Sequence, residues 1–167
     1  MKNGIQYFVV GLCYKNADLL TRGKFTLNKK QIKLLLEKAR VDGLTELMVN
    51  STCNRIEIYG IVPDPNLLIS YLCEFSDGDL ECFMDKGYVL KGKEAINHVF
   101  RVGCGLESQI LGDFEIIGQL KKSFYFSKKL KMFNGFSERL VNSVIQSSKR
   151  IKTETDISTG ATSVSFA

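Results

Sequence analysis

The sequence has no tryptophan, only two prolines and a single histidine, and none of its apolar runs approaches the ~20 residues that a membrane span needs. The scarcity of proline and a hydrophobic content of 44% exclude a disordered linker and predict a folded core. The N-terminus has neither the apolar core of a signal peptide nor the arginine-rich and serine-rich character of a transit peptide. These absences predict a cytoplasmic protein without a membrane segment.

Cysteine is present, but not in the arrangement of a metal site. No pair among the five cysteines has Cys-x-x-Cys spacing, and one histidine adds little to a set of ligands, so we expect no metal. An odd number of cysteines in a chain without an export signal favours free thiols. Cys13, Cys73 and Cys104 have apolar or glycine-rich neighbours, as packing residues do, whereas Cys82 has no evident role.

The charge is mildly basic, with a net value of +5. Such a charge suits a polyanionic partner without requiring one. The densest cluster consists of Lys121, Lys122, Lys128, Lys129 and Lys131. It fits a solvated helix face, and it also fits a surface that contacts RNA phosphates.

Periodicity and turn residues predict the order of the elements along the chain. In the first half they place a strand at 6–14, a helix at 28–40 capped by Thr26 or Asn28, strands at 44–50 and 56–62, and a short helix ending at Leu72. In the second half they place a loop or weak strand at 77–90, a helix at 93–102, and two helical pieces from 113 that break near 134–135. This order predicts an α+β fold. We expect a small antiparallel sheet backed by helices, in ferredoxin-like βαβ units, followed by a long helical extension.

The segment Ser-Thr-Cys-Asn-Arg-Ile-Glu at 51–57 places a cysteine among polar side chains between two predicted strands. A cysteine kept only for packing usually has apolar neighbours. Arg55 follows Cys53 by two residues, and in extended chain such residues point to the same side, where a cation favours the reactive thiolate. The pattern leaves two interpretations of Cys53 open, a nucleophile and an inert buried thiol.

His98 borders the apolar face of the helix predicted at 93–102. It is either a structural hydrogen-bonding residue or, if the fold brings it to Cys53, an acid or base for that thiol. A polar segment punctuated by glycines follows at 105–119. This segment fits a capped helix start, and it also fits a substrate-facing loop. No Gly-x-Gly-x-x-Gly turn follows a strand, so the sequence predicts no dinucleotide site.

Three blocks of this sequence together resemble glutamyl-tRNA reductase. They are the segment 51–57, the block His-Val-Phe-Arg-Val-Gly-Cys-Gly-Leu-Glu-Ser-Gln-Ile-Leu-Gly at 98–112, and Gly-Ala-Thr-Ser-Val-Ser-Phe-Ala at 160–167. Members of the family are much longer than this chain. The resemblance therefore implies a catalytic glutamyl-tRNA-binding domain at 1–150, including the start of a long connecting helix. It also implies that 151–167 is a connector toward an NADPH-binding domain that the chain lacks.

The resemblance assigns roles to individual residues. It makes Cys53 the catalytic nucleophile and His98 a second catalytic residue. It implies substrate-binding roles for Thr52, Asn54, Arg55, Ser108, Asp113, Phe114, Glu115 and Gln119. The guanidinium of Arg55 suits bidentate pairing with the glutamyl carboxylate. The tripeptide at 113–115 departs from the Glu-Pro-Gln that is usual in the family: the acid at 113 is shorter, and Phe114 has a backbone donor that proline lacks.

The implied reaction makes glutamate-1-semialdehyde from glutamyl-tRNA and NADPH, the first step of tetrapyrrole (porphyrin and haem) biosynthesis from glutamate. A thiolate can displace the tRNA from this activated ester, and the resulting thioester can accept hydride. The implied partners are glutamyl-tRNA, a second subunit in the homodimer of the full-length enzyme, and, as a candidate, glutamate-1-semialdehyde aminomutase. The alternative function is a non-catalytic tRNA-binding or assembly module with a structural cysteine.

Overall fold

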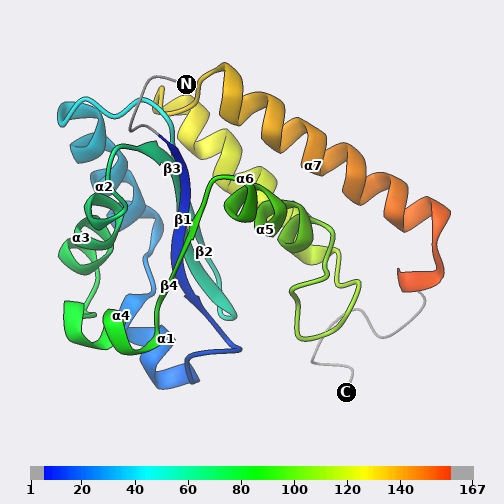
Figure 1. Ribbon diagram of the computed structural model, residues 1–167, viewed down its shortest axis with the longest axis horizontal. Coiled ribbons are helices and arrows are strands. Elements are labelled where there is room, and N and C mark those ends of the chain that lie inside the picture. Colours follow the sequence, from blue (N-terminus) through cyan, green and yellow to red (C-terminus); the bar gives the residue numbers. More distant parts are fainter. Residues whose placement is uncertain (1–5, 159–167) are drawn as a thin grey trace.

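A four-stranded antiparallel sheet in the order β2-β3-β1-β4 forms the middle layer of the fold (Figure 1). It is seen in a computed structural model that describes residues 6–158, so the matching block at 160–167 lies outside the described residues. The strands are β1 (Gln6–Cys13), β2 (Leu47–Ser51), β3 (Arg55–Val62) and β4 (Tyr88–Lys91). β1 and β2 both run antiparallel to the strand between them, β3, which is the arrangement of a split βαβ unit. The predicted α+β class is therefore confirmed.

Helices cover both faces of the sheet. One face carries α1 (Leu19–Phe25), α2 (Lys29–Val41), α3 (Asn66–Phe75) and α4 (Leu80–Lys86), and the other carries α5 (Lys93–Gly103), α6 (Glu115–Lys129) and the long α7 (Gly135–Glu154). A short 3-10 helix, Asp156–Ser158, follows. Alternate residues of β1 supply the two cores, since Phe8 and Val10 pack toward α2 and α3 while Tyr7 and Val9 pack toward α5 and α7.

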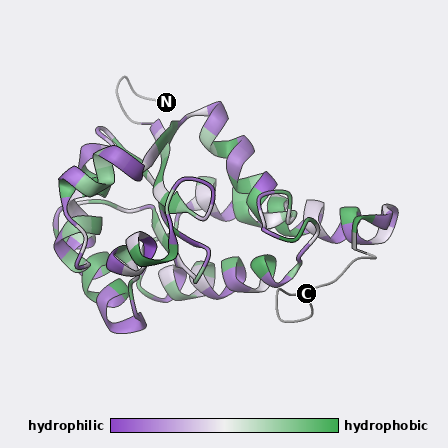
Figure 2. Ribbon diagram, turned by 90° about the horizontal axis from the view of Figure 1, so that it is seen from below, coloured by the Kyte–Doolittle hydropathy of each residue, from purple (hydrophilic) through white to green (hydrophobic). Residues whose placement is uncertain are grey.

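The helices are amphipathic, and Figure 2 shows apolar and polar residues on different sides of them. The predicted start of α2 is confirmed at Asn28, whose side chain accepts from the backbone N–H groups of Lys30 and Gln31 in a capping box. Thr26, the other expected cap, instead ends α1. Gly43 follows the helix with a φ of +89°, a conformation that favours glycine.

Two short helices were missed in the sequence. The stretch that forms α4 was expected to be a loop or a weak strand, and this prediction is wrong. Asp79 caps α4 by accepting from the Cys82 N–H at 2.8 Å, and Phe83 anchors it in the core. α1 is likewise capped by Asp18 and anchored by Phe25. Each helix has only seven residues, too few to produce a helical period that sequence inspection would recognise.

The last helix continues past the expected end of the catalytic part. The predicted boundary at 150 falls inside α7, whose last residue is Glu154. A domain boundary at this position stays a prediction. Among the helices within residues 6–158, none combines the length and the apolar character needed to cross a lipid bilayer.

Gly11 makes room for a buried carboxylate in the middle of the sheet. It pairs with Glu57 across β1 and β3. A Cβ at position 11 would lie 2.3 Å from the carbonyl oxygen of Ile56 and 2.8 Å from Cγ of Glu57. Both distances are far below van der Waals contact, and the carbonyl belongs to the strand backbone, which cannot rotate away. The two central strands can therefore pair at this point only if position 11 has no side chain.

We expect Gly11→Ala to lower the free energy of unfolding by at least about 1–3 kcal/mol, the usual cost of overpacking. Gly23→Ala is the matched control, because nothing lies within 4 Å of a Cβ at this α1 position. This control should be neutral or stabilising, since alanine is favoured over glycine in helices. Urea denaturation of both variants measures the difference. Equal stability of Gly11→Ala and the wild type would contradict the packing argument.

Candidate active site

The turn that carries Cys53 joins β2 to β3 and is held by hydrogen bonds on both sides. The Thr52 hydroxyl accepts from the backbone N–H groups of Asn54 at 3.3 Å and Arg55 at 3.1 Å, as hydroxyl side chains commonly do in turns. The Tyr14 N–H donates to the Asn54 carbonyl at 2.9 Å, which ties the turn to the end of β1. Arg22 of α1 donates through Nε to the Cys53 carbonyl at 3.1 Å. The backbone at Cys53 is thus fixed.

Cys53 is the one exposed cysteine of the chain's five, all of which are free thiols in the structure. Cys13 and Cys104 are buried, and Cys73 and Cys82 are half-buried. Burial raises the pKa of the Cys73 and Cys104 thiols, which makes their thiolates less available at neutral pH. Exposure on a rigid turn therefore distinguishes Cys53 from the other cysteines as the thiol that a substrate can reach.

Cys53 opens onto a cavity of about 230 Å³ between the turn and α6. Thr52 and Cys53 line one wall, and Gln119 and Lys122 of α6 line the other. The fold thus brings Gln119 to Cys53 although a large part of the chain separates them. Lys122 is exposed, and within residues 6–158 it forms no ion pair, so the cavity contains a positive charge that is not balanced locally.

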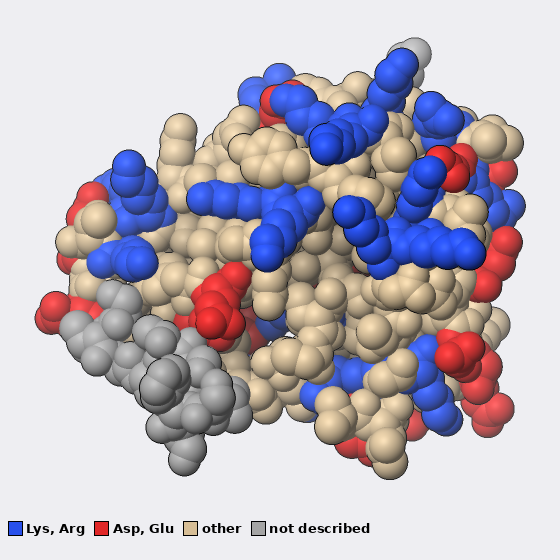
Figure 3. Space-filling model, turned by 180° about the vertical axis from the view of Figure 1, so that it is seen from behind, with Lys and Arg blue, Asp and Glu red and all other residues tan. Residues whose placement is uncertain are grey.

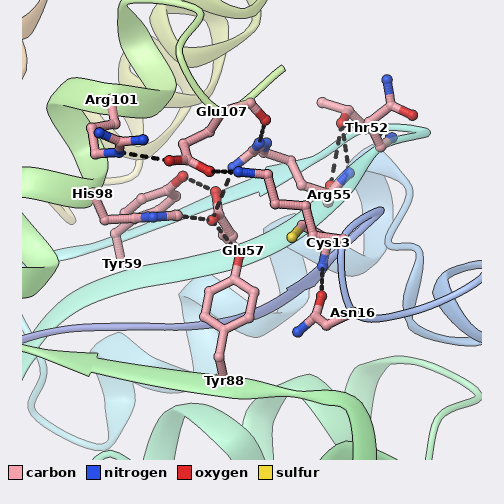
Figure 4. Close-up of polar contacts among 12 residues, drawn as sticks. Cys13, Asn16, Thr52, Arg55, Glu57, Tyr59, Tyr88, His98, Arg101 and Glu107 are labelled. Carbon is pink, nitrogen blue, oxygen red and sulfur yellow. Dashed lines mark hydrogen bonds and ion pairs between the residues drawn. The ribbon is translucent and has the colours of Figure 1, made fainter. Parts of the chain in front are cut away.

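Glu57 is the centre of a second group of polar residues, and its side chain is fully buried (Figure 4). Its carboxylate contacts Nη1 of Arg55 at 3.2 Å and Nε2 of His98 at 2.5 Å. The hydroxyls of Tyr59 and Tyr88 also donate to it, the latter at 2.5 Å. Arg55, Glu57 and Tyr59 alternate along β3 and therefore share one face of the sheet. β3, β4 and α5 are fastened to one another at this carboxylate.

The charges around Glu57 decide its protonation. Burial alone would raise the pKa of this carboxyl, yet Arg55, followed by His98, lowers it from 4.5 to about 2. Burial and the Glu57 charge raise the pKa values of the Tyr59 and Tyr88 hydroxyls well above their ordinary value, so both hydroxyls stay protonated as donors. Glu57 is therefore an anion at neutral pH, and Arg55 is its counter-ion.

The loop between α5 and α6 lies over Arg55. Nη2 of Arg55 donates to the Glu107 carbonyl at 2.5 Å, and the Glu107 carboxylate pairs with Arg101 at 2.6 Å and with Lys15. The Tyr14 hydroxyl donates to the Ser108 carbonyl at 3.1 Å. Ser108 is thereby held close to the end of β1 and to the turn that follows β2. The loop is fastened to the sheet through both its backbone and its side chains.

The structure groups the predicted site residues unevenly. Cys53, Thr52 and Gln119 share the cavity, whereas Arg55 and His98 meet at Glu57. Within residues 6–158 no hydrogen bond joins His98 to Cys53, so the fold does not form the pair that would make His98 an acid or base for that thiol. The Arg55 side chain is only 3% exposed, and a substrate carboxylate would have to displace Glu57 or the Glu107 carbonyl to reach it.

The tripeptide 113–115 begins α6. The Asp113 side chain accepts from the Glu115 N–H at 2.9 Å, Phe114 occupies the N-cap position, and Glu115 is exposed in the first turn. These contacts are the helix-start arrangement that acidic residues favour. Asn54 contributes its backbone to the Cys53 turn. A substrate role for any of these side chains stays a prediction.

Several residues of the site were missed by sequence reasoning. Glu57 stood in the quoted motif, but only the alternation of polar residues at 55, 57 and 59 could have indicated a shared face. Asn50 gave no local signal, and Lys122 stood out only as a member of the lysine cluster. Neither could be placed at the Cys53 cavity from sequence, because the fold alone brings α6 to the end of β2. Asn50 is 1% exposed and, among residues 6–158, its Nδ2 has no hydrogen-bond partner.

The described residues do not fit a dinucleotide cofactor. The strands of this sheet are antiparallel, and the β1–α1 connection at 14–18 has no glycine to cradle a pyrophosphate. Residues 6–158 also hold no cluster of three or more histidine, cysteine or acidic side chains that could bind a metal ion.

We expect Glu57→Gln to lower the free energy of unfolding by about 3–5 kcal/mol at neutral pH, because it leaves the buried Arg55 charge unbalanced. Glu154→Gln is the control: it breaks an exposed helix pair with Arg150, and such pairs contribute about 0.5 kcal/mol or less. Urea denaturation of the three proteins gives the comparison.

The difference in unfolding free energy between the wild type and Glu57→Gln should also depend on pH. Because the folded pKa of Glu57, about 2, lies below its ordinary 4.5, its stabilisation is complete above 4.5 and is lost as the pH falls toward 2. The gap between wild type and Glu57→Gln should therefore shrink by about 2 kcal/mol between about pH 6 and about pH 3. A gap that stays constant over this range would contradict the assigned charge of Glu57.

With this geometry established, comparisons with known proteins identify the family. Residues 10–155 match the model of the glutamyl-tRNAGlu reductase N-terminal domain. The chain is 56% identical over 167 residues to glutamyl-tRNA reductase of Christiangramia forsetii, covering all of this chain and 40% of that protein. It is 57% identical over 161 residues to glutamyl-tRNA reductase of Flavobacterium psychrophilum, covering 96% of this chain and 39% of the relative.

A solved structure of glutamyl-tRNA reductase from Methanopyrus kandleri superposes with a TM-score of 0.78 at 27% identity, covering 94% of this chain and 37% of that one. The chain thus spans about 40% of the length of the curated relatives that it matches. The family match covers both the Cys53 turn and the Glu57 network. The chain therefore belongs to the glutamyl-tRNA reductase N-terminal domain family.

Proposed function

We propose that this chain performs the acyl-transfer half of glutamyl-tRNA reduction, with Cys53 as the nucleophile. The observation that carries the proposal is the exposure of Cys53, alone among five cysteines, on a fixed turn beside a polar cavity. Its family membership supplies glutamyl-tRNA as the substrate. The whole reaction would be the first step of tetrapyrrole synthesis.

The transfer follows from ordinary acyl chemistry. The Cys53 thiolate attacks the carbonyl carbon of the glutamyl ester, and the carbon–sulfur bond forms as a tetrahedral oxyanion develops. The oxyanion then expels the ribose oxygen of the tRNA, which takes up a proton, and a glutamyl thioester remains on Cys53. Lys122, which lines the cavity, adds a positive charge beside the developing oxyanion or beside the glutamyl carboxylate.

We propose that Arg55 and His98 act chiefly through Glu57. Their contacts with Glu57 hold β3 and α5 together, and the hydrogen bond from Arg55 to the Glu107 carbonyl fixes the loop that carries Ser108. In this arrangement His98 is a positioning residue. Direct binding of the glutamyl carboxylate by Arg55 stays a prediction, as do the substrate contacts of Asn54 and of the tripeptide 113–115.

We propose that NADPH, the reductant that the family uses, is bound outside residues 6–158. The antiparallel sheet and the glycine-free β1–α1 connection support this assignment. Homodimer formation, contact with glutamate-1-semialdehyde aminomutase and a cytoplasmic location stay predictions from the resemblance.

Cys53→Ser should abolish acyl transfer while leaving the fold intact, because a serine hydroxyl of similar size needs a base to become nucleophilic. The measurement is a single turnover with glutamyl-tRNA, quenched in acid and examined by mass spectrometry for a glutamyl adduct on the 51–57 peptide. Cys82→Ser removes a half-buried thiol and is the matched control, which should form the adduct as the wild type does. Adduct formation by Cys53→Ser at the wild-type rate would remove Cys53 from its role. Tight tRNA binding by the wild type without any adduct would favour the alternative, a non-catalytic module.

The chain by itself should hydrolyse glutamyl-tRNA slowly and should not reduce it. Without a hydride donor, the thioester remains in an open cavity where water can attack it, releasing glutamate and regenerating the thiol. Product analysis with and without added NADPH tests this expectation, and the rate of glutamate release should be the same in both. Formation of glutamate-1-semialdehyde that depends on NADPH would contradict the assignment of cofactor binding to residues outside 6–158.

A further inference from the structure

The chemistry of an aminoacyl ester limits where the tRNA can lie. The scissile ester joins the glutamyl group directly to the terminal ribose of the tRNA. When the carbonyl carbon is at Cys53, the terminal nucleoside must therefore occupy a space that adjoins the Cys53 cavity.

One groove does adjoin the cavity. It runs between α2 and α6 along the edge strand β2, with a volume of about 560 Å³, and we call it the α2–α6 groove. Ser51, Lys122 and Ser123 line both this groove and the Cys53 cavity, so the two spaces adjoin. Its size lies within the ~300–1,000 Å³ typical of pockets for small molecules and cofactors. The hollow beside α5, which His98 lines, shares no lining residue with the Cys53 cavity.

The α2–α6 groove is lined by cations that have no acidic partner. Lys29, Lys122 and Lys129 line it, all three are exposed, and none forms an ion pair with a carboxylate of residues 6–158. Lys128, the neighbour of Lys129 on α6, instead pairs with Glu138 at 2.5 Å. Figure 3 shows Lys and Arg side chains gathered in a band across the face of the molecule opposite to that seen in Figure 1. Unpaired lysines along a groove suit the phosphates of a nucleic-acid strand.

Aromatic rings lie between these lysines. Tyr125 lines the groove and is 59% exposed, although its ring centroid lies 5.0 Å from that of Phe124. Phe126 also lines the groove, and Nζ of Lys29 lies 5.6 Å from its ring centroid. Buried Leu27 and Val49 form an apolar floor. Phe126 is half-buried, so Tyr125 is the exposed ring, and an exposed aromatic ring within a cationic groove is the usual platform on which unpaired bases stack.

We propose that the α2–α6 groove binds the unpaired 3′-terminal nucleotides of the tRNA, with a base stacked on Tyr125 and phosphates at Lys29 and Lys129. The proposal rests on the proposed function, since it is the ester at Cys53 that requires a nucleoside there. It divides recognition of the substrate between two adjoining spaces. The Cys53 cavity receives the glutamyl group, and the groove receives its leaving group.

The test compares two acyl donors in single-turnover acylation of Cys53 within the 167-residue chain. One donor is glutamyl-tRNA, and the other is a glutamyl thiobenzyl ester, which has no nucleoside. Tyr125→Ala should slow transfer from glutamyl-tRNA by about ten- to a hundredfold, the effect of losing one stacked base. Tyr125→Phe retains the ring and should restore most of that rate. Both variants should accept the small ester at the wild-type rate.

The proposed phosphate contacts of Lys29 and Lys129 are tested by varying the salt concentration. Lys29→Gln and Lys129→Gln should each reduce by about 0.7 the slope of log rate against log salt concentration for glutamyl-tRNA, as expected for one lost contact with a single strand. Lys128→Gln, the same charge change on the neighbouring residue, is the matched control and should leave the slope unchanged. Thermal melting of each variant verifies that the fold is retained.

The outcomes separate the two proposals. A lower acylation rate with glutamyl-tRNA, but not with the small ester, supports tRNA binding in the groove. Equal losses with both donors, full tRNA activity of Tyr125→Ala, or a Lys128→Gln effect as large as that of Lys129→Gln would overturn the groove while leaving acyl transfer to Cys53 in place. A wild-type chain that neither donor acylates would overturn the proposed function, and the groove proposal with it.

Discussion

The structure depends on one buried carboxylate, that of Glu57, which is kept ionised by Arg55 and His98. A buried charge is tolerated only when it is paired and hydrogen-bonded, so the elements that supply its partners must all dock in one arrangement. These elements are β3 itself, β4 through Tyr88 and α5 through His98. Gly11 supplies the space on β1. Through Arg55 the constraint extends to the Glu107 carbonyl, and hence to the loop beside the Cys53 turn.

This arrangement explains how a small domain can present an exposed thiol on a rigid turn. The charged side chains around Glu57 pair with one another and hold the scaffold together. Arg55 belongs to this group, and its backbone N–H also donates to Thr52, so the turn before β3 is held in place as well. Cys53 itself has an exposed side chain and faces a cavity that includes Lys122. The sequence suggested that Arg55 would serve the thiol or the substrate directly. The structure shows the Arg55 guanidinium already engaged by a carboxylate and a carbonyl, which leaves Lys122 as the unpaired cation at the cavity.

Sequence patterns predicted those features that are local. The strands β1 and β3, the Asn28 cap and the break between α6 and α7 are set by residues that are neighbours in the chain, and all of them were expected. The seven-residue helices α1 and α4 were missed because each is anchored by one buried phenylalanine rather than by a periodic stripe. The Glu57 network and the presence of Gln119 in the Cys53 cavity depend on docking between distant elements. The lysine cluster shows the same limit, since only the fold separates Lys129, which lines the groove, from Lys128, which pairs with Glu138.

In the proposed reaction Cys53 receives the glutamyl group in the cavity that it shares with Gln119 and Lys122. A crystal structure of the wild-type chain, flash-cooled after a short soak with a glutamyl thioester, tests it most directly. We expect electron density for a glutamyl group bonded to Sγ of Cys53, with the group lying between the turn and α6 and with Arg55 still paired to Glu57. An acyl group on any other residue, or a glutamyl chain directed into the hollow beside His98, would rule out this site for the acyl group.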